Sequence, residues 1–363
     1  MSEDIRLMKG NEVIAHAAVR YGCDGYFGYP ITPQSEVMET LMELKPWEST
    51  GMVVLQSESE TASGNMLYGA AAVGKLALTS SSSPGISLMS EAMSYMAGAE
   101  LPAVIINCQR GGPGLGTIQP SQADYMQACK GGGHGDFKLI VVAPNSVQEM
   151  HDHVALAFDL AIKYRNPAMI LTDGIIGQMM EKVVLAPQRE RMTKEESFER
   201  FGSWAATGNQ GLRKSNVVTS LALQAPDMER VNQRLQEKYA AMQSEVLYEE
   251  LNCDDAEYII VAFGSSARIC AATVELARER GYKVGLIRPI TLYPFPYDAI
   301  NKHAQRGVKG FLSAELNCGQ MVEDVRLAVE GRAVVKHYGR QGGMIFSPDE
   351  VLEAMINDLI CEE

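Results

Sequence analysis

Apolar and polar positions follow two different periods along the first half of the chain. Longer segments carry apolar residues at helical spacing, among them residues 60–73, 86–99, 122–129 and 146–165. Between them lie short continuous apolar runs, at GYFGY, MVVL, KLALTS, AVIIN, LIVVA and AMILT. Continuous apolar strands that alternate with helices are typical of a parallel sheet covered on both faces. The pattern therefore predicts a doubly wound α/β domain.

The first helical segment also suggests where its helix begins and ends. In NEVIAHAAVRYG the apolar residues Ile14, Ala18 and Tyr21 recur at helical spacing. Asn11 is a residue type that often caps a helix N-terminus, and glycine commonly ends a helix. We expect Asn11 to be the N-cap and Gly22 to be the stop.

The alternation stops near residue 180 and resumes near residue 254. The segments QRERMTKEESFERFG and APDMERVNQRLQEKYAAMQSE are highly charged and contain no strand run. They predict a mostly helical or extended connector that wraps the first domain, with a solvated linker as the alternative. A second alternation runs from YIIVAFG through GFLSAEL and AVVKHYG to a helix at residues 348–360. We predict an α/β domain at 1–180, a connector at 181–253 and a smaller α/β domain at 254–363.

The composition of the chain argues against several classes of binding partner and site. The chain has 363 residues and a formal net charge of −13, which makes it a poor candidate for binding nucleic acid or anionic membrane. No apolar run is long enough to span a membrane, and MSEDIRLMKGNE lacks the apolar core of a signal peptide. The seven cysteines are scattered without a C-x-x-C pair, which argues against a zinc or iron–sulfur site in this chain. We expect a protein of the reducing cytoplasm.

Polar side chains follow several of the predicted strands. Glu58 and Glu60 separate the run MVVL from an alanine-rich helix, and Arg110 opens the glycine-rich loop RGGPGLGT. Thr32 lies between two prolines in YPITP, at the end of an earlier strand. Helix capping, a surface ion pair and a βα turn would explain these residues structurally. The alternative is a ligand site at the carboxyl ends of the strands, where open α/β sheets bind their ligands.

Phosphate-binding signatures are missing from the sequence. There is no G-x-x-x-x-G-K-[ST] and no Gly-Asp-Gly, and the glycine-rich loops do not follow a dinucleotide fingerprint. The chain therefore shows no Mg–diphosphate site of its own.

Several motifs in order resemble one family. The segments are GYPITPQSE, QSESE, SSPGISLMSEAMSYMAGAELP, QRGGPGLGTIQPSQADY, KGGGHGD and APNSVQEM, followed by GLIRPITLYPFP and AELNCGQM. Together they resemble the alpha-type subunit of 2-oxoacid:ferredoxin oxidoreductases, with variants most similar to the branched-chain (2-oxoisovalerate) members. The resemblance implies a thiamine-diphosphate pyrimidine-binding fold followed by a transketolase-C-terminal-like domain.

This resemblance also implies a divided enzyme. Thiamine diphosphate would be shared with a beta-type partner that binds Mg and the diphosphate. The other partners would be a gamma-type subunit and a ferredoxin-like iron–sulfur subunit. The [4Fe-4S] clusters would also lie in partner subunits. The reaction would convert a 2-oxo acid and CoA to acyl-CoA, CO₂ and reduced ferredoxin. The alternatives are the same reaction on 2-oxoglutarate or another 2-oxo acid, or a non-catalytic assembly subunit.

The resemblance also implies roles for individual residues. Related enzymes place the catalytic glutamate nine residues before a glycine, an interval that Glu60 and Gly69 match and Glu58 does not. The resemblance therefore implies Glu60 as the catalytic residue, with Glu58 as the fallback. It implies that Thr32 and Arg110 hold the substrate. The cofactor contacts that it implies are Pro30, Glu60, Ser83 and Gly85, although SSSSPG departs from the Ser-Gly-Pro-Gly that relatives often have.

Overall fold

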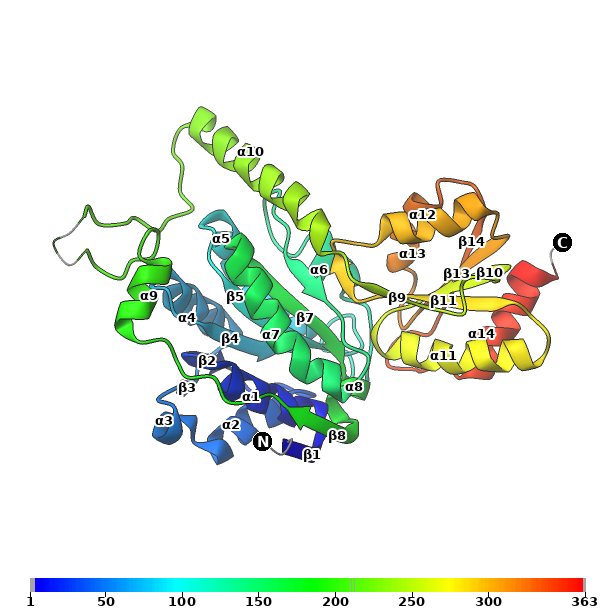
Figure 1. Ribbon diagram of the computed structural model, residues 1–363, viewed down its shortest axis with the longest axis horizontal. Helices are drawn as coiled ribbons and strands as arrows, with labels where there is room; N and C mark the ends of the chain where they lie inside the picture. Colours follow the sequence, from blue (N-terminus) through cyan, green and yellow to red (C-terminus); the bar gives the residue numbers. More distant parts are fainter. Residues whose placement is uncertain (1–3, 210, 212, 362–363) are drawn as a thin grey trace.

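A seven-stranded sheet forms the centre of the larger domain in the computed structural model, which describes residues 4–209, 211 and 213–361 (Figure 1). Its strand order is β12-β6-β7-β5-β4-β2-β3, and all neighbours run parallel except β12, which is antiparallel to β6. The strands are β2 (Gly25–Gly28), β3 (Val53–Gln56), β4 (Ala77–Ser81), β5 (Ala103–Gln109), β6 (Ile140–Val142), β7 (Pro167–Asp173) and β12 (Thr291–Tyr293).

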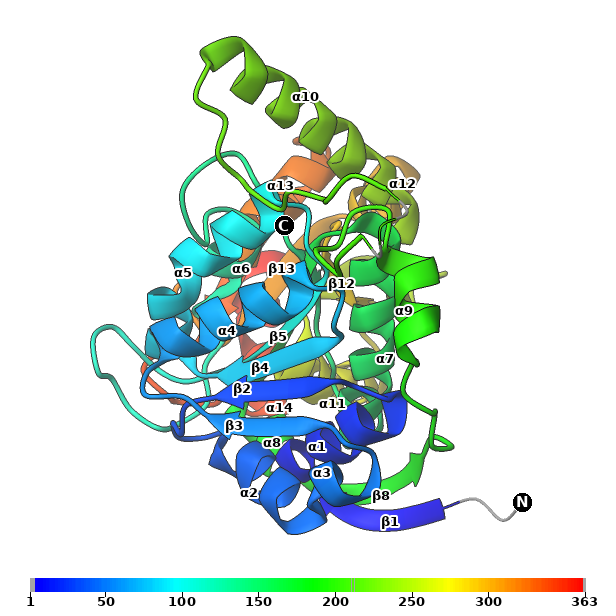
Figure 2. The same cartoon turned by 90° about the vertical axis from the view of Figure 1, so that its left-hand side faces the viewer.

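Helices cover both faces of this sheet, as the sequence predicts (Figure 2). Every residue of β5 is buried, and alternate residues enter different cores: Val104 packs with α1, α2 and α7, and Ile105 packs with α4, α5 and α6. The expected doubly wound fold is therefore present. The helices are α1 (Gly10–Tyr21), α2 (Ser35–Leu44), α3 (Pro46–Ser49), α4 (Glu60–Ala72), α5 (Ser83–Gly98), α6 (Tyr125–Cys129), α7 (Val147–Tyr164) and α8 (Gly174–Gln178).

Helix α1 ends where it was expected to end but begins two residues earlier than predicted. Gly22 follows it in the left-handed conformation with φ 87°, which suits glycine. The prediction that Asn11 is the N-cap is wrong, because the helix starts at Gly10 and Asn11 lies inside it. The Asn11 side chain instead donates to the Pro33 carbonyl at 2.6 Å, and so ties α1 to the proline-rich turn after β2.

The helix expected at 122–129 starts later, at Tyr125. Gln122, three residues before this start, is held by the smaller domain: its backbone N–H donates to the Leu316 carbonyl at 3.0 Å and its side chain donates to the Phe263 carbonyl at 2.8 Å. These bonds across the domain junction take the place of a first helical turn.

The connector contains strands that the sequence pattern did not predict. Strand β8 (Met180–Leu185) pairs antiparallel with β1 (Asp4–Lys9), and β9 (Tyr248–Leu251) joins the edge of the second sheet. These strands are largely exposed, so they lack the continuous apolar run of a buried strand. The other elements are α9 (Lys194–Phe201), α10 (Ala225–Ala241) and a 3₁₀ turn (Met242–Glu245).

The rest of the connector packs on the larger domain. Phe201, Leu235, Tyr239 and Met242 are buried in the core that α1 and α7 share, so both ends of this segment pack on the domain, whereas the described residues between 206 and 234 are mostly exposed. The boundaries at residues 180 and 253 stay predictions.

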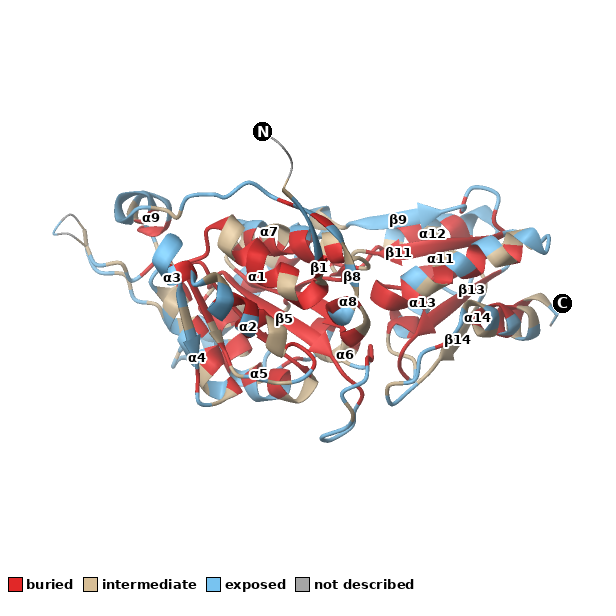
Figure 3. Ribbon diagram, turned by 90° about the horizontal axis from the view of Figure 1, so that it is seen from below, coloured by how far each residue is buried: buried red, intermediate tan, exposed pale blue. Residues whose placement is uncertain are grey.

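The smaller domain is built on a second sheet of five strands in the order β14-β13-β10-β11-β9, where only β9 is antiparallel to its neighbour. Figure 3 shows β9 as an exposed edge beside buried central strands. The elements are β10 (Tyr258–Val261), α11 (Gly264–Glu279), β11 (Val284–Pro289), α12 (Tyr297–Arg306), β13 (Gly310–Glu315), α13 (Met321–Val329), β14 (Val334–Gly339), α14 (Pro348–Met355) and a π-helical turn (Ile356–Ile360).

The two domains are packed firmly together. Strand β12 leaves the smaller domain to extend the first sheet, and one apolar core runs from α4 and α5 into β10 and α13. Buried Asp324 on α13 accepts a hydrogen bond from the Tyr125 hydroxyl at 2.6 Å and pairs with Lys130. No helix in the described part of the chain is long and apolar enough to cross a membrane.

Candidate active site

The carboxyl ends of the parallel strands β2 to β5 meet at one edge of the large sheet, and each is followed by a segment that the sequence singled out. Thr32 follows β2, Glu60 follows β3, Ser83 follows β4 and Arg110 follows β5. Because the strands are parallel, their carboxyl ends point the same way. The topology therefore gathers these segments on one side of the domain.

Glu60 is the first residue of α4 and only 8% of it is exposed. The Ser59 hydroxyl caps the helix by accepting from the Ala62 N–H at 3.2 Å. A carboxylate in a first helical turn is favoured by the helix dipole. Among the described residues, no group donates a hydrogen bond to the Glu60 carboxylate. Glu60 is buried, whereas Glu58 is exposed. Glu60 thus offers a buried carboxylate that is free to bind a ligand.

Gly85, in the first turn of α5, lies directly against Glu60. A Cβ atom at position 85 would lie 2.1 Å from the Ser81 hydroxyl oxygen and 2.8 Å from Glu60 Oε1. Only glycine allows this approach without displacing the carboxylate. The hydroxyls of Ser81 and Ser82 are also buried, and neither has a hydrogen-bond partner in the described part of the structure. Buried polar groups normally have partners, so these two hydroxyls are unusual within the described part of the structure.

Arg110 lies at the end of β5 and is 7% exposed. Its Nη1 donates to the Thr32 carbonyl at 3.0 Å, and its Nη2 donates to the Leu115 carbonyl at 3.1 Å. The buried Nε has no partner among the residues described. Two loops therefore hold the guanidinium in place.

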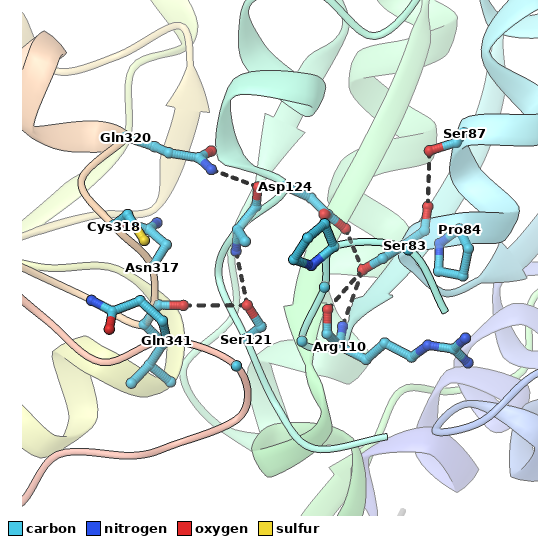
Figure 4. A pocket seen from close by; sticks show the side chains of 17 residues that line it. Ser83, Pro84, Ser87, Arg110, Ser121, Asp124, Asn317, Cys318, Gln320 and Gln341 are labelled. Carbon is cyan, nitrogen blue, oxygen red and sulfur yellow. Dashed lines mark hydrogen bonds between the residues drawn. The ribbon is translucent and has the colours of Figure 1, made fainter. Parts of the chain in front are cut away.

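A cavity of about 360 Å³ adjoins Arg110 at the junction of the two domains (Figure 4). Ser83, Arg110 and Asp124 line it from the larger domain, and Asn317 and Gln320 line it from the smaller domain. Arg110 is the only Lys, Arg or His among the described residues that line it. The smaller domain thus contributes directly to the same cavity, through the polar loop after β13.

Thr32 and Pro30 lie at the outer side of this region. Both are exposed, and Thr32 lines a neighbouring hollow of about 380 Å³ together with Ile118, Ile175 and Ile345. The structure brings Thr32 to Arg110 through its backbone carbonyl. A substrate contact by the Thr32 hydroxyl, and a cofactor contact by Pro30, stay predictions.

Asp124 is a site residue that the sequence reasoning missed. It lines the cavity, and its carboxylate accepts from the Ser83 hydroxyl at 2.6 Å and from Asn107 Nδ2 at 2.8 Å. Burial raises the pKa of Asp124, and the two hydrogen bonds oppose that rise. A signal was present in the sequence, because Asp124 is the only acidic residue between Leu101 and Gly135, the segment that also contains Arg110.

Two family models match the chain in series. Residues 16–250 match the model described as pyruvate flavodoxin/ferredoxin oxidoreductase, thiamine diphosphate-binding. Residues 256–351 match core domain II of pyruvate:ferredoxin oxidoreductase.

Curated relatives match over nearly the full length. The ketoisovalerate oxidoreductase subunit VorB of Methanothermobacter thermautotrophicus is 48% identical over 350 residues, which cover 96% of each chain. The 2-oxoglutarate synthase subunit KorA of Archaeoglobus fulgidus is 34% identical over 360 residues, which cover 98% of this chain and all of the relative. Both names describe a subunit, so relatives of this chain work in multi-subunit complexes.

Solved structures confirm the predicted fold. The 2-oxoglutarate:ferredoxin oxidoreductase from Magnetococcus marinus, solved with 2-oxoglutarate, coenzyme A and succinyl-CoA bound, superposes with a TM-score of 0.85 at 24% identity. The match covers 98% of this chain and 65% of that one. A split-gene transketolase superposes with a TM-score of 0.60 at 11% identity. With the family models and the full-length relatives, these matches show that the chain belongs to the pyruvate flavodoxin/ferredoxin oxidoreductase family, as an oxidoreductase subunit with the thiamine diphosphate-binding domain of that family.

Proposed function

We propose that this chain supplies the aminopyrimidine half of a divided thiamine diphosphate site in a branched-chain 2-oxoacid:ferredoxin oxidoreductase. The complex would convert 2-oxoisovalerate and CoA to acyl-CoA, CO₂ and reduced ferredoxin. The observation that carries the proposal is the first turn of α5. Gly85 contacts the unpartnered Glu60 carboxylate there, and two residues earlier Ser83 bonds to Arg110. The first turn of α5 thus contacts both the Glu60 carboxylate, which would serve the cofactor, and the backbone of Arg110, which would bind the substrate.

Glu60 and Gly85 would hold the cofactor, with Pro30 and Ser83 as further proposed contacts. When bound, thiamine diphosphate supplies the carbanion-stabilising chemistry that cleaves the bond between the carboxyl and carbonyl carbons. The role of Glu60 is to hold a proton at a nitrogen of the aminopyrimidine ring, which a buried carboxylate without a competing donor can do. Gly85 has no side chain, so the first turn of α5 can lie against that carboxylate without displacing it.

Arg110 would bind the substrate carboxylate. A guanidinium presents its donors as a planar fork that matches a carboxylate, and the buried Nε–H of Arg110 has no partner among the described residues. Its Nη1 and Nη2 are already held by backbone carbonyls, so the fork is oriented before the substrate arrives. The Thr32 hydroxyl would then donate to the oxo group.

The remaining parts of the enzyme would come from partners in the cytoplasm. The sequence has no Gly-Asp-Gly motif and no C-x-x-C pair. A beta-type partner would therefore bind Mg and the diphosphate, and a ferredoxin-like subunit would carry [4Fe-4S] clusters beside a gamma-type subunit. CoA would be the acyl acceptor.

The chain expressed alone is expected to contain no iron and to bind thiamine diphosphate only weakly, with a Kd well above micromolar. Its sequence has neither the Gly-Asp-Gly motif of a Mg–diphosphate site nor the closely spaced cysteines of an iron–sulfur site. Calorimetric titration with thiamine diphosphate and Mg²⁺, together with iron analysis, measures both properties. The co-expressed complex serves as the positive control. Stoichiometric iron, or micromolar cofactor affinity without partners, would contradict the divided site.

The assembled enzyme is expected to prefer 2-oxoisovalerate over 2-oxoglutarate by at least roughly tenfold in kcat/KM, because well-buried methyl groups are worth about that much. A second substrate carboxylate needs a second cation, and a buried unpaired charge is very unfavourable. The described residues around the Arg110 cavity offer none, and the hollow beside Thr32 is lined by Ile118, Ile175 and Ile345.

Steady-state reduction of ferredoxin or viologen at saturating CoA, with both acids, measures this preference. The greater identity to the ketoisovalerate relative than to the 2-oxoglutarate relative supports the same assignment. Equal or higher efficiency with 2-oxoglutarate would contradict the branched-chain assignment and leave the thiamine mechanism standing.

A further inference from the structure

The Ser83 hydroxyl lies between Asp124 and the backbone of Arg110 (Figure 4). Its oxygen is 2.6 Å from Asp124 Oδ2, 3.1 Å from the Arg110 nitrogen and 3.3 Å from the Arg110 carbonyl oxygen. The hydroxyl therefore has two possible acceptors for its hydrogen and one N–H group that can donate to it.

A serine hydroxyl has a single hydrogen, so only one of these acceptors can receive it fully. Hydrogen bonds to a carboxylate are shorter and stronger than those to a neutral carbonyl. Asp124 is both the closer and the charged acceptor, and so takes the hydrogen. The Ser83 oxygen is then left to accept from the Arg110 N–H. Asp124 therefore determines that the Ser83 hydroxyl accepts from the Arg110 N–H and does not donate to the Arg110 carbonyl.

Asp124 is itself anchored to the strand that ends at Arg110. Its Oδ2 accepts from Asn107 Nδ2 at 2.8 Å, and its backbone N–H donates to Gln109 Oε1 at 3.0 Å. Asn107 and Gln109 both belong to β5. The hydrogen bonds thus run from β5 through Asp124 and Ser83 back to the residue after β5, and they fix its backbone.

We propose that Asp124 and Ser83 are positioning residues, which fix the Arg110 backbone and so aim its guanidinium at the substrate carboxylate. The inference rests on the proposed role of Arg110 in substrate binding. Backbone anchoring by Ser83 complements the bonds from the guanidinium to the Thr32 and Leu115 carbonyls. Loss of this anchor weakens binding of the 2-oxo acid and leaves the proton chemistry at Glu60 intact.

The test compares four variants of the assembled complex: Asp124→Ala, Asp124→Asn, Ser83→Ala and the double alanine variant. We expect Asp124→Ala and Ser83→Ala each to raise KM for the 2-oxo acid roughly tenfold, in line with the loss of a hydrogen bond to a charged group. For Asp124→Ala, the kcat and the KM for CoA stay within about threefold. Asp124→Asn retains an acceptor oxygen and restores KM to within about threefold. The double variant is no worse than either single one, because both act through the same bond.

Asp136→Ala is the matched control, since Asp136 is an exposed aspartate in the loop after α6. Additive effects in the double variant, or a fall in kcat at unchanged KM, would overturn the inference. Ser83→Ala removes one oxygen only, and therefore tests it even if Asp124→Ala does not assemble. If Arg110→Lys raises KM while Asp124→Ala and Ser83→Ala do not, this inference alone fails. If Arg110→Lys also leaves KM unchanged, the proposed substrate site fails with it.

Discussion

Replacing Glu60 with glutamine is expected to lower kcat of the assembled enzyme by roughly 100- to 10,000-fold, the usual contribution of a positioned acid–base group. The amide keeps the size of the carboxylate and its contact with Gly85, but it cannot exchange a proton at the aminopyrimidine ring. We expect the thermal stability of the chain to change little, because no described residue donates a hydrogen bond to the Glu60 carboxylate. Single-turnover and steady-state assays of the co-expressed complex measure the loss.

Glu58→Gln is the matched control for this experiment. Glu58 is two residues away, has the same chemistry and is exposed. The activity of the Glu58→Gln enzyme should therefore stay within a few-fold of wild type. An inactive Glu58 variant beside an active Glu60 variant would reverse the assignment. Full activity in both variants would favour the non-catalytic assembly subunit.

Replacing Arg110 with lysine is expected to lower kcat/KM for the 2-oxo acid by about 100-fold. Truncating one partner of a buried, hydrogen-bonded charge pair weakens binding by several kcal/mol, and a lysine ammonium cannot reproduce the guanidinium fork. Lysine also cannot reach both the Thr32 and Leu115 carbonyls while its charge still faces a ligand. The loss should appear mainly in KM for the 2-oxo acid, with little change in cofactor affinity.

Arg268→Lys is the control for the loss of a guanidinium in general. Arg268 lies on α11 and pairs with Glu181 at the surface, where an ion pair contributes little. We expect its kinetics to equal those of wild type. An Arg110→Lys enzyme with unchanged KM would show that the substrate carboxylate binds elsewhere.

Much of the central sheet could be predicted because its strands are buried on both faces. Strand β5 is buried at every residue, and its first four residues, 103–106, form the continuous apolar run that is typical of buried parallel strands. The same local logic predicted Gly22 as the end of α1, where the left-handed conformation suits glycine. The sequence likewise singled out Glu60 and Arg110 as charged residues next to apolar strands.

Edge strands were harder to predict because their pairing is made by backbone groups. The partners β1 and β8 are far apart in the sequence, at residues 4–9 and 180–185, and their side chains are largely exposed. Strand β12 has only three residues and belongs by sequence to the smaller domain, yet it extends the larger sheet. A local apolar pattern carries no information about which distant backbone completes such a ladder.

For the candidate site, the sequence alone determined which charged side chains follow which strands, because strand ends and helix starts are local features. Only the tertiary structure decided that Asp124 reaches Ser83 and that Asn317 closes the cavity from the smaller domain. The same holds for Asn11. The local pattern predicted it as a helix cap, but in the packed structure its side chain bonds to the proline-rich turn. The physical reason is that a hydrogen bond between distant segments depends on how their helices and sheets pack, and each segment's own periodicity records burial but not the identity of its partner.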